Sequence, residues 1–241
     1  MKTFNINYHI KSFDVDMAKK LKISKLFHLF QEVAYQHASI LNFGYQDLKE
    51  KNLFWVLARV NVKFHNFPVW NDDIKIKTWH KGGQRLFAYR DFQIFKKSGE
   101  RLIDATSSWL IVDVRAKRPV RIKNYLDNAS AQKEKNALDK ELNRINIPDK
   151  IKKVGTGSIS YSDIDLNNHV NNAKYIEWMM DHIDIDILLN RSITNLSVNF
   201  LKETKFNDKL SIYQTRSKNI IYSLFKKNEK DIFHAKLALK E

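Results

Sequence analysis

Alternating and helix-periodic patterns of apolar side chains divide the first half of the chain into a strand, a long helix and further strands. Residues 4–11 alternate apolar with polar side chains, which predicts a half-buried strand. A helix is expected to begin near Ser24, a suitable N-cap, and to end near Gly44. Its buried face would carry apolar side chains three and four residues apart: Phe27, Phe30, Ala34, Ala38 and Leu41. Period two returns at 58–65 and 74–78, and two further strands are expected at 86–95 and 102–112, so we predict a helix packed on an antiparallel sheet.

The segment 124–154 has a different composition. It is polar, highly charged and poor in large apolar residues, so we interpret it as a linker. Residues 131–143 have the composition of an exposed helix, and nothing in that helix would need burial. We therefore place an N-terminal repeat at residues 1–123, a linker at 124–154 and a C-terminal repeat at 155–241.

The predicted order of elements repeats after the linker. A short strand is expected at 158–161, a helix at about 170–189, and strands near 196–201, 210–216, 220–225 and 233–239. Asn171 and Asn172 are suitable N-caps for the helix. The sequences of the halves also match at constant offsets. Val60–Ile76 lies over Leu196–Ile212 at an offset of 136, and Asp14–Leu21 lies over Asp163–Val170 at an offset of 149, which indicates an internal duplication.

The segment Tyr161–Trp178 carries the candidate chemistry. Asp165, Asn167 and His169 occupy alternate positions, so an extended segment would direct a carboxylate, an amide and an imidazole to the same side. An Asx-rich turn that caps the following helix is the alternative interpretation.

A comparison of the halves favours a functional site. Three polar groups of the second half align with residues of different character in the first: Asn167 with Ala18, His169 with Lys20, and Glu203 with Phe67. A helix cap would be expected to persist in both halves, and these groups do not. Asp165, in contrast, aligns with Asp16, which leaves a partly structural role open for this carboxylate.

Composition narrows the chemistry. The 241 residues contain no cysteine, which excludes a disulfide framework, a thiolate nucleophile and a cysteine-ligated metal. The remaining histidines lack ligand spacing, and we expect neither a metal nor a cofactor. No apolar run approaches the ~20 residues needed to span a bilayer, so we expect a cytoplasmic protein without a membrane span. We assign most of the tryptophans to the core, with the lining of a tunnel as the alternative: Trp55, Trp70, Trp79 and Trp109.

The net charge of +15 favours an anionic partner, which nucleic acid, a membrane surface or an acidic protein would each satisfy. No basic helix with base-reading side chains and no nucleic-acid module is recognisable in the sequence, so we do not expect nucleic-acid binding.

The motif D-I-D-L-N-N-H-V-N-N-A-K-Y-I-E-W, residues 163–178, resembles the signature of the acyl-acyl carrier protein thioesterases of bacteria and plastids. Further residues and segments that match the family extend the resemblance over nearly the whole chain: Arg59, KTWHKG around Trp79, YRDF around Arg90, and ATSSWLIVD before Asp113. The resemblance implies an α+β double hotdog, in which each of two tandem repeats wraps an antiparallel sheet around a long central helix. It also implies hydrolysis of fatty acyl-acyl carrier protein, which releases free fatty acid and ends chain elongation.

The resemblance assigns the family's aspartate, asparagine and histidine to Asp165, Asn167 and His169, and its glutamate to Glu203. Plant members usually carry a cysteine beside that glutamate, whereas this chain has Thr204, so a cysteine mechanism is excluded. We expect Glu203 to orient or tune His169, and Asn167 to donate a hydrogen bond near the thioester carbonyl. Asp165 would either activate water or attack directly to form an anhydride.

The substrate is expected to contact both an apolar and a basic region. The acyl chain would enter the first half between its helix and its sheet, on a floor formed by Phe27, Phe30 and Ala34. An acidic acyl carrier protein would bind the cationic cluster after the last strand of that half: Arg115, Lys117, Arg118, Arg121 and Lys123. Within it we single out Arg118 and Arg121 as substrate-binding residues. A solvated basic face is the alternative, and we allow for a homodimer.

Three competing functions stay open. An acyl-coenzyme A thioesterase would use the same fold and similar groups. A hotdog hydratase would be expected to have a proline between the asparagine and the histidine, where this chain has Asn168. A non-catalytic binder of acyl ligands is the alternative outside enzymes.

Overall fold

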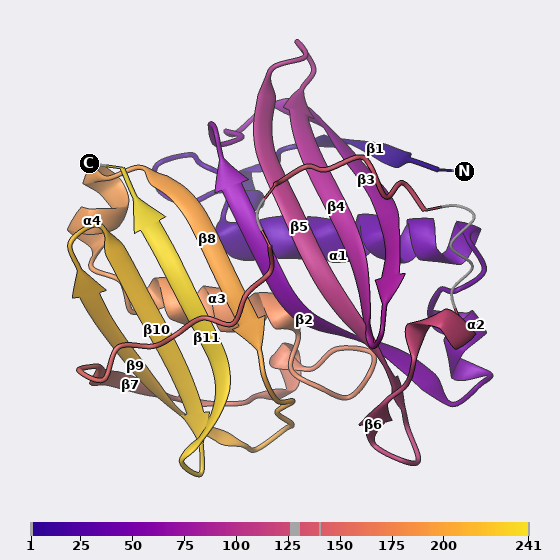
Figure 1. The fold of residues 1–241 in the computed structure, drawn as a ribbon. Helices are drawn as coiled ribbons and strands as arrows, with labels where there is room; N and C mark the ends of the chain where they lie inside the picture. Colours follow the sequence, from indigo (N-terminus) through magenta and orange to yellow (C-terminus); the bar gives the residue numbers. More distant parts are fainter. Residues whose placement is uncertain (1, 126–130, 140, 241) are drawn as a thin grey trace. The chain divides into compact units, whose positions relative to one another are not determined.

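The computed structural model describes residues 2–125, 131–139 and 141–240, so residues 126–130 and 140 of the predicted linker lie outside the described residues. The chain divides into two compact units, Met1–Leu142 and Asn143–Glu241. Each unit combines helices with an antiparallel sheet, as predicted from the hydrophobic patterns (Figure 1).

The sheet of the first unit has the strand order β1-β3-β4-β5-β2, and every neighbouring pair is antiparallel. Its strands are β1 (Phe4–His9), β2 (Leu53–Phe64), β3 (Asp73–Gln84), β4 (Phe87–Lys96) and β5 (Arg101–Asp113), with the short β6 (Arg118–Pro119) paired to β5. The predicted alternation is confirmed in β2, where Val60 and Val62 are buried and Lys63 is exposed. One face of β2 therefore supplies the core at these positions, whereas residues 102–108 of β5 are buried without alternation.

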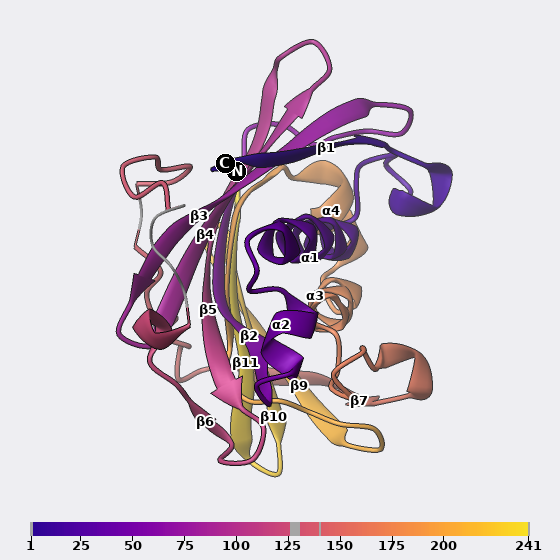
Figure 2. The same ribbon diagram turned by 90° about the vertical axis from the view of Figure 1, so that its right-hand side faces the viewer.

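Helix α1 (Ile23–Ile40) lies against one face of this sheet (Figure 2). Phe27, Phe30 and Ala34 are buried along it as predicted, and the ring of Phe30 stacks on Phe92 of β4 with centroids 4.4 Å apart. The predicted cap at Ser24 is wrong. Lys22 is the N-cap, because its backbone amide donates to the carbonyl of residue 14 at 3.0 Å and so fixes where the helix begins. The short α2 (Tyr45–Lys49) follows.

The sheet of the second unit has the order β8-β11-β10-β9-β7, again antiparallel. Its strands are β7 (Lys152–Ser158), β8 (Ile193–Phe200), β9 (Lys209–Ser217), β10 (Ile220–Lys227) and β11 (Lys230–Leu239). The strand predicted at 158–161 is wrong in position, because β7 ends at Ser158 and Tyr161–Asp163 forms a 3-10 turn.

The helix predicted over 170–189 is two helices, α3 (Asn172–Asp181) and α4 (Ile185–Asn190). Asn171 caps α3 by accepting from the amide of Ala173 at 2.9 Å, in agreement with the prediction. Asp184 caps α4 by accepting from the amide of Asp186 at 2.8 Å. This second cap starts a new helix where the apolar periodicity alone suggests a continuous one.

The duplicated segments fold alike in the two units. Each unit retains a buried aspartate paired with a lysine in the first turn of the following helix: Asp14 with Lys25 at 3.1 Å and Asp163 with Lys174 at 3.3 Å. Each unit also retains a left-handed asparagine before its next strand, Asn71 at φ 68° and Asn207 at φ 66°. The internal duplication inferred from sequence is therefore also a structural one.

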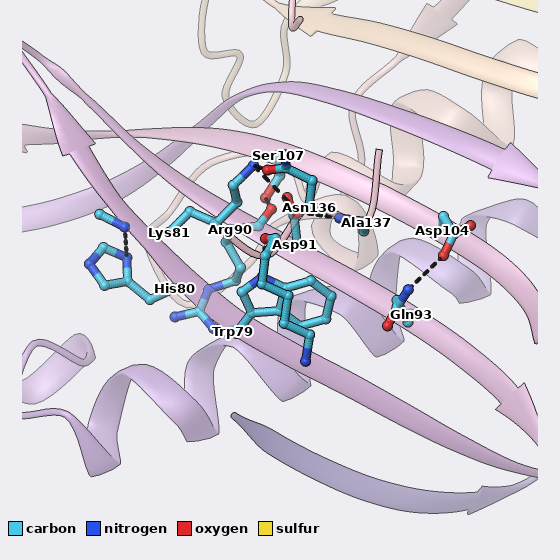
Figure 3. A network of polar contacts seen from close by, with 12 residues as sticks. Trp79, His80, Lys81, Arg90, Asp91, Gln93, Asp104, Ser107, Asn136 and Ala137 are labelled. Atoms are coloured by element: carbon cyan, nitrogen blue, oxygen red, sulfur yellow. Dashed lines mark hydrogen bonds and ion pairs between the residues drawn. The ribbon is translucent and has the colours of Figure 1, made fainter. Parts of the chain in front are cut away.

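The segment predicted to be an exposed helix is neither helical nor fully exposed in its described residues. Trp79 donates from Nε1 to the carbonyl of Lys135 at 2.9 Å, and the amide of Ala137 donates to Oδ2 of Asp91 at 2.7 Å (Figure 3). Ala137 is buried as a result. In the second unit Ile145 is also buried, and its amide donates to Oδ1 of Asn199 at 2.8 Å. The sheets supply hydrogen bonds that hold this chain extended against them.

The tryptophans differ in their surroundings. Trp79 is fully buried, and Trp55 and Trp109 are partly buried against an apolar cluster that includes Phe43. Trp70, in contrast, is 44% exposed, so its assignment to the core is wrong. It lies just before a tight turn at Asn71, which takes its side chain out of the strand alternation.

Candidate functional site

Asp165, Asn167 and His169 lie on a tight loop that follows the 3-10 turn of the second unit. An isolated bridge between Ile164 and Val170 closes the loop, and the amide of Asp165 donates to the carbonyl of His169 at 2.8 Å. Asn168 adopts a left-handed φ of 62° within it. The predicted extended segment is therefore wrong, because the backbone reverses between the first and last members of the trio. All three residues are half-buried.

The Asp165 carboxylate organises this loop. Its Oδ1 accepts from the amide of Asn167 at 2.8 Å and, more weakly, from that of His169 at 3.4 Å. This is the Asx turn that the sequence left as an alternative. Within the described chain, Oδ2 of Asp165 has no hydrogen-bond partner. One oxygen of the Asp165 carboxylate thus holds the backbone of the loop.

His169 and Glu203 meet across two segments that are far apart in sequence. Nε2 of His169 lies 3.0 Å from Oε2 of Glu203, with side-chain exposures of 20% and 40%. The amide of Val170 donates to the carbonyl of Thr204 at 3.0 Å, which ties the loop to the segment after β8. A carboxylate at Nε2 favours the tautomer with its proton on that nitrogen and fixes the orientation of the ring. The predicted pairing of these residues is thus present in the structure.

The side chain of Thr204 anchors the segment that carries Glu203. Thr204 is fully buried, and its Oγ1 lies 2.5 Å from Oη of Tyr175 on α3. Burial raises the pKa of Tyr175 to about 12, so its hydroxyl keeps its proton. Sequence patterns gave Tyr175 only as part of an apolar helix face. In the sequence, only the polar Thr204 after Glu203 indicated that a buried hydroxyl would need a hydrogen-bond partner such as Tyr175.

The residues predicted to bind substrate occupy two kinds of environment in the first unit. Phe27, Phe30 and Ala34 are buried on α1 itself, and Arg118 and Arg121 are exposed on β6 and just after it. These environments suit an acyl chain and an acidic partner respectively, and the binding itself stays a prediction.

The described part of the chain contains no group of three or more histidine, aspartate or glutamate side chains placed to hold a metal ion. None of its helices has the length and apolar character needed to cross a membrane.

Family comparison covers most of the chain. The N-terminal domain of acyl-ACP thioesterases matches residues 1–128, and the C-terminal domain of acyl-ACP thioesterases matches residues 149–240. A chloroplastic acyl-[acyl-carrier-protein] hydrolase from Cuphea viscosissima is 25% identical over 221 residues, which are 84% of this chain and 52% of that protein. A chloroplastic oleoyl-acyl carrier protein thioesterase from Coriandrum sativum is 24% identical over 224 residues, 86% of this chain and 60% of that one. The chain thus spans a little over half the length of these relatives.

Solved structures with the same fold include an acyl-ACP thioesterase from Bacteroides thetaiotaomicron. It superposes with a TM-score of 0.89 at 27% identity, covering 99% of this chain and 98% of that one. A 12:0-ACP thioesterase from Umbellularia californica superposes with a TM-score of 0.81 at 22% identity, covering 99% and 97%. These likenesses confirm the predicted double hotdog fold.

Proposed function

We propose that this chain, which belongs to the acyl-ACP thioesterase family, hydrolyses the thioester between a fatty acyl group and acyl carrier protein. The observation that carries the proposal is the 3.0 Å contact between His169 and Glu203, beside a loop held by Asp165. The same substrate class is supported by two relatives, the acyl-[acyl-carrier-protein] hydrolase from Cuphea viscosissima and the oleoyl-acyl carrier protein thioesterase from Coriandrum sativum.

Thioester hydrolysis needs a nucleophile, stabilisation of the developing oxyanion and a proton for the departing thiolate. We assign proton transfer to His169, whose ring is oriented by Glu203. The side-chain amide of Asn167 is placed on the same loop and would donate to the thioester oxygen. A water oxygen bonds to the acyl carbon, the carbon–sulfur bond breaks, and the water's proton reaches the leaving thiol through His169.

The hydrogen bonds of Asp165 favour water activation over direct attack. Backbone donors on Oδ1 stabilise the negative charge of the carboxylate and so weaken it as a nucleophile. Oδ2 would then orient or deprotonate the attacking water. A single turnover in water labelled with oxygen-18 tests this step. Label in the fatty acid alone supports water attack, and label in the Asp165 carboxylate would establish an anhydride instead.

The acyl chain and the carrier protein are assigned to regions of the first unit by the polarity and exposure of the side chains there. We place the acyl chain against the apolar side chains of Phe27, Phe30 and Ala34, and the acidic carrier protein against Arg118 and Arg121. A role in ending fatty acid synthesis, a cytoplasmic location and a homodimer belong to the same proposal.

The choice of carrier is tested by comparing kcat/KM for one acyl group on acyl carrier protein and on coenzyme A. We expect higher kcat/KM on the carrier protein, because a protein carrier has charges that the basic face can bind. A preference for coenzyme A would overturn the choice of carrier and keep the chemistry. Failure to hydrolyse either substrate would overturn the proposed function.

A further inference from the structure

The first unit exposes several large apolar side chains on two neighbouring loops. Phe13 is 67% exposed and Met17 is 73% exposed, both between β1 and α1. Val69 and Trp70, just before β3, are 37% and 44% exposed. Large apolar side chains gathered on a surface mark an interaction site more often than scattered ones do.

Direct contacts join these loops into one surface. The amide of Trp70 donates to the carbonyl of Lys19 at 2.9 Å, and Lys20 forms a β-bridge with Val69. Nζ of Lys22 donates to the carbonyl of Phe13 at 3.4 Å. In Figure 2 the indigo segment between β1 and α1 projects to one side of α1, where it forms a rim of the unit.

Lysines surround the apolar side chains. Nζ of Lys11 lies 5.6 Å from the ring centre of Phe13, and Nζ of Lys19 lies 6.0 Å from that of Trp70. The exposed acid among them is Asp16, which offsets one of these charges. We define the basic apolar patch by its members: Lys11, Phe13, Met17, Lys19, Lys20, Lys22, Val69 and Trp70.

The second unit shows that the fold does not require these lysines. At the aligned positions it builds the same loop with uncharged or titratable residues: Ser160 for Lys11, Asn168 for Lys19, His169 for Lys20 and Asn171 for Lys22. It keeps exposed apolar residues at two of the aligned positions, Leu166 and Phe206, at 59% and 56%. The second unit has one exposed lysine at an aligned position, Lys205 for Val69. The four lysines at positions 11, 19, 20 and 22 are thus a feature of the first unit and call for an explanation other than folding.

We propose that the basic apolar patch binds the surface of a lipid layer with anionic headgroups. Phe, Trp and Met side chains on projecting loops can insert at the boundary between headgroups and acyl chains, and lysines are attracted by the negative surface potential. A protein partner is disfavoured by the composition, because protein interfaces are enriched in arginine and depleted in lysine. The patch contains four lysines and no arginine.

The proposal is independent of the thioesterase chemistry and is tested by vesicle binding. The full chain is sedimented with vesicles of phosphatidylcholine containing about a third phosphatidylglycerol, and with vesicles of phosphatidylcholine alone. We expect binding to the anionic vesicles only, with an affinity that falls as salt is added. Equal binding to both kinds of vesicle, or binding to neither, would overturn the proposal.

Matched variants locate the binding surface. Reversing two charges with Lys11→Glu and Lys22→Glu should weaken vesicle binding roughly tenfold or more, since each lysine near an anionic surface contributes to attraction. The same charge change at Lys49→Glu and Lys51→Glu, on and just after α2, should have a much smaller effect. Met17→Gln should weaken binding, and its aligned counterpart Leu166→Gln should not. Thermal unfolding of each variant shows that it is folded, and equal effects within either pair would overturn the assignment.

The fluorescence of Trp70 gives a second reading on the same proposal. Its emission should shift to shorter wavelength on anionic vesicles, and the shift should be absent in Trp70→Phe. If Lys11→Glu and Lys22→Glu instead weaken binding of acyl carrier protein, with no vesicle binding by the wild type, the patch is a protein docking surface. If they abolish a dimer seen by sedimentation, again without vesicle binding, the patch binds a second copy. Either result would contradict the lipid proposal.

Discussion

Asp16 and Asp165 hold their loops by the same hydrogen bonds in the two units. Oδ1 of Asp16 accepts from the amides of Ala18 and Lys20 at 2.9 and 3.0 Å. Oδ1 of Asp165 accepts from the amides of Asn167 and His169 at 2.8 and 3.4 Å. Both loops also contain a left-handed residue, Lys19 in the first and Asn168 in the second. The loop is therefore a scaffold that both units share, and the chemistry proposed for the second unit would depend on the side chains that its loop carries.

Asp165→Asn separates the two roles of this carboxylate. The amide oxygen can still accept the backbone hydrogen bonds, so the free energy of unfolding should change by less than about 1 kcal/mol. The charge needed to activate water is lost, so kcat should fall roughly 10²-fold or more. Denaturant unfolding and steady-state kinetics measure the two effects.

Asp16→Ala is the matched control for the scaffold. It removes the same backbone hydrogen bonds from a loop without catalytic side chains, and should cost about 1 kcal/mol of stability with kcat nearly unchanged. If Asp165→Asn keeps most of its activity, or if Asp16→Ala loses as much activity as Asp165→Asn, the division between scaffold and chemistry is wrong.

Tyr175 and Thr204 are expected to stabilise the segment of Glu203 as a pair. Tyr175→Phe leaves the buried Oγ1 of Thr204 without its hydroxyl partner and should lower the free energy of unfolding by roughly 1–3 kcal/mol. Adding Thr204→Val should recover part of this loss, because both polar groups are then gone. Strictly additive losses in the double variant would show that the two hydroxyls do not interact.

Acid should destabilise the first unit through His80. The side chain is 2% exposed, and burial, followed by the charge of Arg90, lowers the pKa of His80 from 6.5 to about 4. The unfolded chain binds a proton on His80 more readily than the folded chain does. The stability that the neutral His80 contributes is therefore complete above pH 6.5 and is lost as pH falls to about 4. The loss should amount to roughly 3 kcal/mol over that window.

The His80→Gln variant tests this pH dependence by its slope and not by its absolute stability. The free energy of unfolding, measured by denaturant at several pH values, should fall less between pH 6.5 and about 4 in His80→Gln than in the wild type. An unchanged slope in His80→Gln would exclude His80 as the source.

Charge reversal at Arg118 and Arg121 should affect the protein substrate selectively. We expect Arg118→Glu with Arg121→Glu to raise KM for acyl carrier protein and to flatten its salt dependence, because exposed charges mainly steer encounter. Turnover of a small acyl thioester should be nearly unchanged. An equal loss of activity on both substrates would indicate a folding or active-site defect. Unchanged activity on both substrates would place the carrier protein elsewhere, for example on Lys150, Lys152 and Lys153.

Hydrophobic periodicity was sufficient to predict the helix–sheet units, because it reports which side chains face the core. The stripe of Phe27, Phe30 and Ala34 and the alternation in β2 both followed from spacing alone. Periodicity does not report hydrogen bonds. The break between α3 and α4 depends on the cap at Asp184, and the extended chain near Ala137 depends on a bond to Asp91, distant in sequence.

The pairing of His169 with Glu203 could be predicted from the sequence, whereas the shape of the loop that carries His169 could not. The loss of Asn167, His169 and Glu203 counterparts in the first half singled these residues out, and the structure brings His169 and Glu203 together. Alternate spacing suggested an extended trio, whereas the side chain of Asp165 bonds its own backbone and turns the chain. A local side-chain hydrogen bond of this kind competes with extended structure and leaves no periodic trace.

Release of free fatty acid from acyl-acyl carrier protein by the wild type and by His169→Ala tests the central claim most directly. The wild type should release fatty acid, and His169→Ala should lose roughly 10²-fold or more in kcat while its thermal unfolding is unchanged. Glu203→Gln should show a smaller loss, since it orients the ring without reacting. If folded His169→Ala releases fatty acid at close to the wild-type rate, the pair of His169 and Glu203 is not the catalytic centre.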